Sequence, residues 1–215
     1  MSNLRGYFIT GTDTEVGKTW ITAAMATAMR HRGLAPVALK PLATGSAPPG
    51  EDATQIAAAA GHAPLVFACM PDPASPDRAA IQIGRVLEMS PILEWIRSHE
   101  GTLLVEGVGG WEVPIGPDFR VSDVATELQL PVILVAADRL GVLNHTLLTA
   151  AAIRRRGLRL AAIILNRFES DDSSLSEWNL EDLRRHIDVP IIPIAPGLVS
   201  DLAEHGLAIL EGLVA

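Results

Sequence analysis

Short apolar runs alternate along the chain with longer stretches in which apolar residues recur at helical spacing. The runs are rich in Val, Ile and Leu and are not interrupted by polar residues, which is typical of strands buried on both faces of a parallel sheet. Six strands are predicted, at Tyr7–Thr10, Val37–Leu39, Thr102–Val105, Val132–Val135, Leu160–Leu165 and Ile191–Ile194. The alternation predicts right-handed βαβ units and an α/β fold in which helices cover both faces of a mainly parallel central sheet.

Helices are predicted between these strands, because Asp, Ser or Asn opens several of the intervening segments and Gly closes some of them. The predicted helices are Lys18–Arg32, Asp52–Ala60, Pro91–Ser98, Asn144–Arg156, Leu180–His186 and Asp201–Leu213. Three segments rich in small or polar residues are predicted to be loops, at Gly45–Gly50, Met70–Asp77 and Glu169–Ser176. None of these loops marks a boundary, so residues 1–215 are expected to form a single domain.

Charge and hydropathy narrow the range of partners. The net charge is −8 and the basic residues form no stripe, so no nucleic-acid partner is expected. No apolar run reaches the roughly 20 residues that cross a bilayer, so no membrane partner is expected either. The N-terminus shows no apolar signal segment, and the single cysteine, Cys69, has no partner for an internal disulfide. These features predict a cytoplasmic protein.

The first predicted strand runs directly into GTDTEVGKT, residues 11–19, and a helix is predicted from Lys18. Backbone N–H groups of such a strand–loop–helix turn point at an anion, and the helix dipole adds to the attraction. Lys18 is expected to neutralise phosphate oxygens of ATP, and the Thr19 hydroxyl to bind Mg²⁺. Five residues separate Gly11 from Gly17 where the usual motif has four, so the loop is a variant. The motif predicts a P-loop NTPase-like fold.

Lysine is rare in this chain, since only Lys18 and Lys40 among the 17 basic residues are not arginine. Both follow predicted strands, at the edge of the sheet where α/β proteins bind ligands. Lysine differs from arginine in being a compact point charge on a flexible stem. Lys40 is therefore expected to reach a transferring phosphoryl group or an anionic intermediate, and Thr44 in the polar loop behind it can donate a hydrogen bond to a substrate.

Two carboxylates complete the candidate chemistry. Glu106 follows the predicted strand Thr102–Val105 and precedes glycines that let backbone approach a ligand closely. A carboxylate in this place beside a phosphate loop can hold Mg²⁺, directly or through water. Asp52 suits the same role or the N-cap of the helix that it opens, and the pattern leaves both open. Thr19, Asp52 and Glu106 are the predicted metal-side groups.

The motif GTDTEVGKT is accompanied by KPLATGS, VEGVGGW, LPVILVA and LGVLNHTLLTA. Together, from about Tyr7 to Leu198, they resemble the ATP-dependent dethiobiotin synthetases. The resemblance implies that CO₂ carboxylates 7,8-diaminopelargonic acid to a carbamate, that ATP phosphorylates the carbamate, and that the second amine closes a ureido ring. It also implies Mg²⁺ as a cofactor and a homodimer with the substrate near its interface.

The same resemblance implies roles for individual residues around the reacting groups. By motif position, Lys40 and Lys18 are the expected catalytic cations, and Thr44 is an expected substrate contact. Gly141 and Asn144 of one subunit are expected to grip the substrate that is bound mainly by the other subunit.

The nucleotide contacts that the resemblance implies extend beyond the phosphate loop. Asn166 is expected to read adenine with help from the turn at Pro196–Leu198. Arg167 stands where an acidic residue is common in the family, and Gly197 where an aromatic residue is common. The residues expected to bind the nucleotide are Thr14, Glu15, Val16, Gly17, Lys18, Thr19, Trp20, Asp52, Glu106, Gly107, Val108, Gly109, Asn166, Arg167, Pro196, Gly197 and Leu198.

Other classes share the phosphate loop. Partition and division-site ATPases act as nucleotide-gated dimer switches, but they normally carry a lysine early in the loop, where this chain has Asp13. The segment from Asp201 is acidic rather than a basic membrane-seeking helix. A cobyrinate-type amidotransferase needs a glutaminase domain, for which the length leaves no room. A simple P-loop kinase needs similar positioning of the phosphoryl group, and VEGVGGW argues against it. The alternative function is that of a partition or division-site ATPase, which acts as a nucleotide-gated dimer switch.

Overall fold

Within residues 4–167 and 173–213, which this computed structural model describes, six strands form a central sheet. In spatial order they are β10 (Ile191–Ile194), β9 (Leu160–Asn166), β8 (Val132–Ala137), β1 (Arg5–Gly11), β5 (Thr102–Gly110) and β2 (Pro36–Leu39). All neighbouring pairs are parallel. The predicted α/β fold with a mainly parallel sheet is confirmed, and each predicted strand is present.

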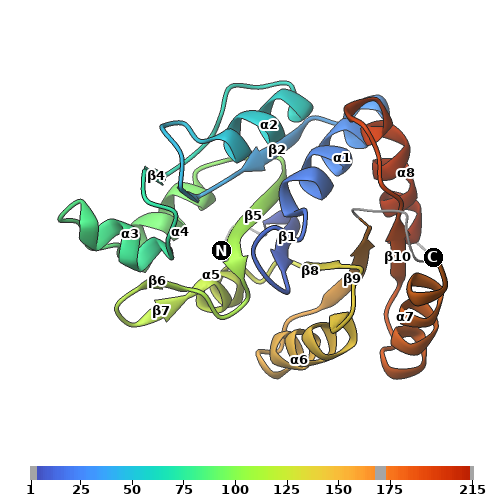
Figure 1. Ribbon diagram of the computed structural model, residues 1–215. Coiled ribbons are helices and arrows are strands. Elements are labelled where there is room, and N and C mark those ends of the chain that lie inside the picture. The colour runs from blue at the N-terminus through green and yellow to red at the C-terminus, as the bar shows by residue number, and fades with distance from the viewer. Residues whose placement is uncertain (1–3, 168–172, 214–215) are drawn as a thin grey trace.

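Two groups of helices cover the two faces of the sheet, as Figure 1 shows. One face carries α1 (Lys18–His31), α2 (Glu51–Ala60) and α8 (Leu202–Gly212), which follows a short 3₁₀ turn at Val199–Asp201. The other face carries α4 (Met89–Arg97), α5 (Val121–Leu128), α6 (Val142–Arg155) and α7 (Ser173–His186). Successive strand residues point to opposite faces of the sheet. Leu104 therefore packs in the core beneath α1, α2 and α8, and Val105 packs in the core on the opposite face. Both faces must therefore be apolar, which explains the unbroken Val, Ile and Leu runs.

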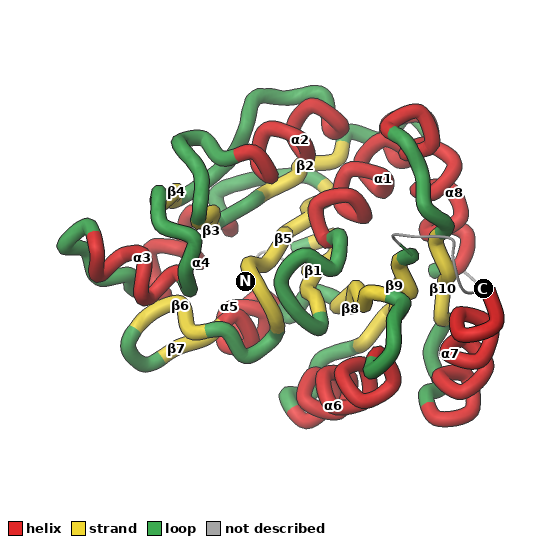
Figure 2. Tube along the Cα trace, in the orientation of Figure 1, coloured by secondary structure: helices red, strands yellow, loops and turns green. Residues whose placement is uncertain are grey.

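Strand β1 lies in the middle of the sheet, between β5 and β8. The chain passes from β1 through α1 to β2 on one side, and it later returns to the other side of β1 with β8. Ligands of open α/β sheets bind where connections diverge in this way, at the carboxyl ends of the strands. The loop from β1 to α1, drawn in green in Figure 2, lies at this point.

Several short elements were not predicted from the sequence. Strand β3 (Leu42–Thr44) pairs with β4 (Ala68–Met70), β6 (Pro114–Gly116) pairs with β7 (Phe119–Arg120), and α3 (Pro76–Gln82) and α5 are additional helices. The predicted loop Met70–Asp77 is wrong at both ends, because Met70 ends β4 and Pro76 opens α3. The Ser75 hydroxyl accepts a hydrogen bond from the Arg78 amide and caps α3, with proline in the first turn.

Helix α7 begins at Ser173, so the predicted loop Glu169–Ser176 is wrong for residues 173–176, and residues 169–172 lie outside the described residues. Serine and acidic residues favour helix starts as well as loops, which is why composition alone misplaced this boundary. The predicted loop Gly45–Gly50 is confirmed. No helix among the described residues is long and apolar enough to span a membrane.

Helices α1 and α8 approach each other very closely at one glycine. A Cβ atom at Gly206 would lie 1.9 Å from the carbonyl oxygen of Ala24 and 2.7 Å from the Cβ atom of Ala28. No side chain fits at this distance, so the missing Cβ allows the two helix backbones to touch. The contact fixes α8 beside the helix that carries the phosphate loop's lysine.

Candidate active site

The loop between β1 and α1 curls around a pocket of about 270 Å³. Glu15 and Gly17 have left-handed backbone conformations, with φ of 58° and 92°. A Cβ atom at Gly11 would lie 2.8 Å from the carbonyl oxygen of Asp13, so the tight closure of the loop requires glycine there. The residues that line the pocket are Thr14, Glu15, Gly17, Lys18, Thr19, Lys40, Thr44, Asp52, Val108 and Gly109.

Lys18 is a buried cation in the first turn of α1. Its Nζ atom donates to the carbonyl oxygen of Asp13 at 2.9 Å, so the ammonium group contacts backbone rather than a carboxylate. Burial lowers the pKa of Lys18 to about 8, with a smaller contribution from the positive charge of Lys40. A phosphate oxygen in the pocket would give this ammonium group a direct anionic contact in addition to the more distant charges of Glu106, Asp52 and Asp13.

Lys40 follows β2 and is only 2% exposed. Its Nζ atom lies 2.6 Å from Oε1 of Glu106 and 2.7 Å from Oδ2 of Asp52. Burial alone would lower the pKa of Lys40, but the charges of Glu106 and Asp52 outweigh it and raise that pKa above its ordinary value. Lys40 is therefore an ammonium group held in place by two carboxylates.

Asp52 does not cap α2. Gly50 is the N-cap residue, and Asp52 lies in the first turn with its carboxylate against Lys40. Burial raises the pKa of Asp52, but the charge of Lys40 and the hydrogen bond from its ammonium group outweigh burial and hold that pKa below its ordinary value. The N-cap alternative for Asp52 is therefore wrong, and its carboxylate faces the phosphate pocket.

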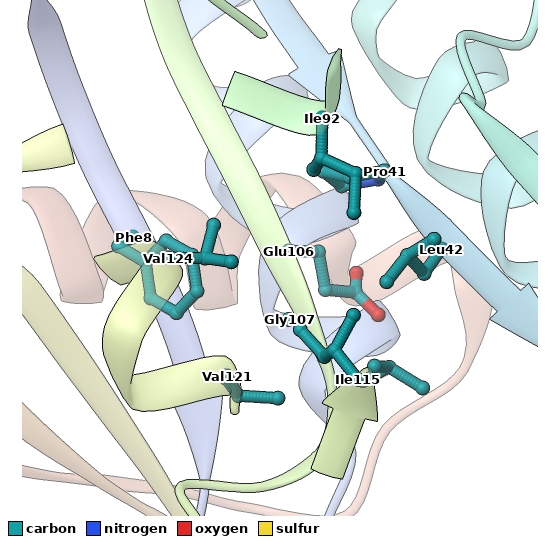
Figure 3. Close-up of a pocket in the computed structure, with 10 residues that line it drawn as sticks. Phe8, Pro41, Leu42, Ile92, Glu106, Gly107, Ile115, Val121 and Val124 are labelled. Atoms are coloured by element: carbon teal, nitrogen blue, oxygen red, sulfur yellow. The ribbon is translucent and has the colours of Figure 1, made fainter. Parts of the chain in front are cut away.

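Glu106 is buried in the middle of β5, beside a small apolar cavity (Figure 3). The prediction that Glu106 follows the strand is wrong, because β5 continues to Gly110. Its Oε1 atom accepts hydrogen bonds from Lys40 and from the Thr19 hydroxyl, the latter at 2.8 Å. Its Oε2 atom is buried and has no hydrogen-bond partner among the described residues. The other residues that line the cavity are Phe8, Pro41, Leu42, Ile92, Gly107, Val108, Ile115, Val121 and Val124. Because these surroundings are apolar, the charge of Glu106 interacts strongly with any cation that reaches it.

A second pocket, of about 200 Å³, contains the residues expected to hold the nucleotide base. It is lined by Trp20, Asn166, Arg167, Ala195, Pro196 and Gly197. Asn166 donates from Nδ2 to the carbonyl oxygen of Val16 at 3.1 Å, and this buried bond ties the end of β9 to the phosphate loop. The loop that encloses the phosphate pocket is therefore bonded to a residue that lines the second pocket.

Six of the predicted contacts line neither of these two pockets. Val16 is buried in the loop, and Glu106 and Gly107 line the small apolar cavity instead. The other three are Leu198, Gly141 and Asn144. Leu198 is 75% exposed and lines neither pocket. Gly141 is the N-cap of α6 and Asn144 lies in its first turn, both exposed and outside the two pockets. The roles of these three residues stay predictions.

Two residues of this region were not predicted as functional from the sequence. Asp138 accepts a hydrogen bond from Arg167 at 3.0 Å and so fixes the guanidinium group at the second pocket. His205 accepts one from the indole of Trp20 at 3.3 Å. Trp20 and His205 are 185 positions apart, so no local pattern could have joined them.

Replacing Asn166 by aspartate is expected to weaken ADP binding about tenfold, because the Val16 carbonyl would lose its donor and face a carboxylate instead. Isothermal titration calorimetry with ADP measures this effect. Gln55→Glu, the same exchange of amide for carboxylate on the exposed face of α2, serves as the control and should leave affinity unchanged. Equal affinities of the Asn166→Asp protein and the unaltered protein would contradict the expected role.

The central β1 strand, its glycine loop and the Lys-Thr pair that opens α1 define a nucleotide-binding protein of the P-loop class. Two solved structures have a similar fold. Their sequence identity to this chain is low, so the similarity concerns the fold alone. The cell division ATPase MinD of Pyrococcus furiosus has a TM-score of 0.60 and 15% identity, covering 98% of this chain and 99% of that chain. A ParA family ATPase of Chlorobium tepidum has a TM-score of 0.53 and 16% identity, covering 98% and 92%.

Sequence comparison resolves the class further. Residues 5–200 match a family model described as an AAA domain. The ATP-dependent dethiobiotin synthetase of Aromatoleum aromaticum is 40% identical over 208 residues, covering 91% of this chain and 92% of that protein. The same enzyme of Ralstonia nicotianae is 41% identical over 203 residues, covering 89% and 88%. The chain belongs to the family of ATP-dependent dethiobiotin synthetases, and the resemblance seen in its motifs is confirmed.

Proposed function

We propose that this protein is a dethiobiotin synthetase, which uses ATP and CO₂ to convert 7,8-diaminopelargonic acid into a cyclic urea. The similarity to the synthetases named above supports this function. The observation that carries it is that both lysines of the chain, Lys18 and Lys40, line one pocket. A carbamate and a γ-phosphate are both anionic and repel each other, so a site that joins them needs cations on both.

The reaction has three steps. One amine of the substrate attacks CO₂ and loses a proton, which gives a carbamate. A carbamate oxygen then attacks the γ-phosphorus of ATP, the bond to the bridging oxygen breaks, and ADP leaves. Finally the second amine attacks the carbonyl carbon and loses a proton, the bond from that carbon to the phosphate oxygen breaks, and phosphate leaves as the ring closes. The protein contributes positioning and charge neutralisation rather than covalent chemistry.

Each lysine has its own part in this scheme. Lys18 leaves the Asp13 carbonyl to contact the β- and γ-phosphate oxygens of ATP. Lys40, fixed by Glu106 and Asp52, neutralises the carbamate and the transferring phosphoryl group. Thr44 lines the same pocket and contacts the diamine.

Thr19, Asp52 and Glu106 are the residues that would hold Mg²⁺ in this enzyme. They offer one hydroxyl and two carboxylates, which are the hard oxygen donors that Mg²⁺ prefers. The Oε2 atom of Glu106, which has no hydrogen-bond partner among the described residues, leaves lone pairs for such an ion, and the lowered pKa of Asp52 keeps that carboxylate ionised. Bound Mg²⁺ supplies positive charge to the phosphate oxygens.

The proposed enzyme is a cytoplasmic homodimer built from one domain per subunit, with no nucleic-acid or membrane partner. Gly141 and Asn144 of one subunit contact the substrate held mainly by the other. Both lie outside the pocket that contains the lysines, close in sequence to the exposed apolar side chains of Leu140 and Leu148. Light scattering in solution tests the assembly, and a monomeric mass would contradict it.

Purified protein supplied with ATP, Mg²⁺, bicarbonate and 7,8-diaminopelargonic acid is expected to release phosphate and to form a cyclic urea, detected by mass spectrometry. Omission of the diamine or removal of CO₂ should each reduce phosphate release to background, and chelation of Mg²⁺ with EDTA should do the same. ATP hydrolysis that is indifferent to both the diamine and CO₂ would exclude the synthetase function and favour the nucleotide-gated switch.

A further inference from the structure

Trp20 is the one aromatic residue among the six described residues that line the second pocket. It stands two positions after Lys18 in α1, so the helix that begins at the phosphate loop also brings the indole to this pocket. The indole is half-buried, with part of its surface free for a ligand. Flat aromatic surfaces bind nucleobases by stacking or packing against their faces.

The indole is held by a contact between helices α1 and α8. Nε1 of Trp20 donates to Nδ1 of His205 at 3.3 Å, and the two rings meet edge to face, with centroids 6.0 Å apart and planes at 64°. An indole N–H can only donate, so Nδ1 of His205 is the acceptor of this hydrogen bond. The polar atom of Trp20 is thus already satisfied, which leaves its apolar surface to face the pocket.

Gly197, which lines the same pocket, permits this arrangement. A Cβ atom at Gly197 would lie 2.4 Å from Cε1 and 3.2 Å from Nε2 of His205. A side chain at position 197 and an imidazole in its present place therefore exclude each other. The absence of a side chain at Gly197 leaves room for the imidazole of His205. The imidazole in turn holds the indole of Trp20 at the pocket.

We propose that Trp20 packs against the base of the bound nucleotide and that His205 is a positioning residue that holds the indole at the pocket. The inference rests on the proposed function in one respect, namely that the ligand is an adenine nucleotide. Arg167 lines the same pocket, and its ion pair with Asp138 fixes the guanidinium group. The base is thus expected to meet one aromatic face and one guanidinium group that an ion pair holds in place.

The test compares ADP with inorganic tripolyphosphate, which has phosphates but no base. Trp20→Leu is expected to weaken ADP binding about tenfold and to leave tripolyphosphate binding within about twofold, because stacking concerns the base alone. Trp20→Phe retains an aromatic ring and should recover most of the affinity for ADP. Equal weakening of both ligands, or unchanged affinity for ADP in Trp20→Leu, would overturn the role of Trp20.

The part played by His205 is tested with two substitutions. His205→Leu removes the acceptor and should weaken ADP binding several-fold with tripolyphosphate unaffected, whereas the side-chain carbonyl of His205→Gln can accept the indole N–H and should restore affinity. Glu204→Ala, at the exposed neighbouring position of α8, is the control and should not alter either ligand.

Two results would contradict the role of His205. One is ADP affinity in His205→Leu that equals that of the unaltered protein. The other is a loss that affects ADP and tripolyphosphate alike, together with a lower melting temperature, as a purely structural contact between α1 and α8 would give. Both ligands are measured without diamine or CO₂, so failure of the synthetase assay would leave this comparison intact.

Discussion

Replacing Lys40 by arginine is expected to lower kcat about 100-fold or more, although the positive charge is kept. The Nζ atom of Lys40 lies within 2.7 Å of oxygens on both Glu106 and Asp52 and is almost completely buried. A planar guanidinium group is larger and presents its donors in a fixed fork, so it cannot occupy the same point between two carboxylates. Steady-state kinetics of diamine-dependent phosphate release measure the loss.

A matched control exchanges the same two residue types on the surface. Arg97→Lys in α4 alters an exposed side chain that lies 3.9 Å from Glu127, and it should leave kcat unchanged. Thermal unfolding of the Lys40→Arg protein separates lost chemistry from lost folding. Near-normal turnover in Lys40→Arg would remove Lys40 from the mechanism, because only a charge and not its position would then matter.

Replacing Gly206 by alanine is expected to lower the free energy of unfolding by about 3 kcal/mol, and the melting temperature by about 10 °C. The new Cβ atom would overlap the Ala24 carbonyl oxygen, which is backbone and cannot swing away, so α8 must move from α1. The direction of this effect is diagnostic, because glycine to alanine in an unobstructed helix is stabilising by about 1 kcal/mol. Differential scanning calorimetry measures the change.

Ala208→Leu provides the comparison for Gly206, because it adds a larger side chain to the same helix at an exposed position. It should leave the melting temperature nearly unchanged. A Gly206→Ala protein that is as stable as the unaltered one, or more stable, would show that the two helices can separate at little cost. The close contact at Gly206 would then have no part in holding α8.

The sheet could be predicted because its pattern is local. Each central strand is a continuous apolar run, and the chain needs no distant information to form one. The elements that were missed are short and gain most of their stability from neighbours. Helix α5 shows this, since Val121, Val124 and Leu128 follow helical spacing but span only 8 residues, too few for a confident prediction from periodicity.

The phosphate pocket could be predicted to a similar degree, because a glycine loop, a Lys-Thr pair and a carboxylate directly after an apolar run each leave a local pattern. The apolar run ends before the strand does, so Glu106 was placed after β5 although it lies within it. What no pattern gives is the partner of each side chain. Lys40 and Glu106 are 66 positions apart, and only the pairing of β2 with β5 brings them together. For the same reason the sequence left two roles open for Asp52, the N-cap of α2 and a metal-side group. The structure rules out the first, because Gly50 is the N-cap and Asp52 pairs with Lys40, and the second stays a prediction.

The contact between Trp20 and His205 spans 185 positions and has a consequence for the order of folding. Strands β1, β2 and β5 and the glycine loop are all synthesised within the first 110 residues, so the phosphate pocket can assemble early. The second pocket must wait for β9, β10 and α8. Contacts of large sequence separation form late, because closing a long loop costs entropy before any contact compensates for it. During synthesis the chain is thus expected to acquire affinity for phosphate before affinity for the base.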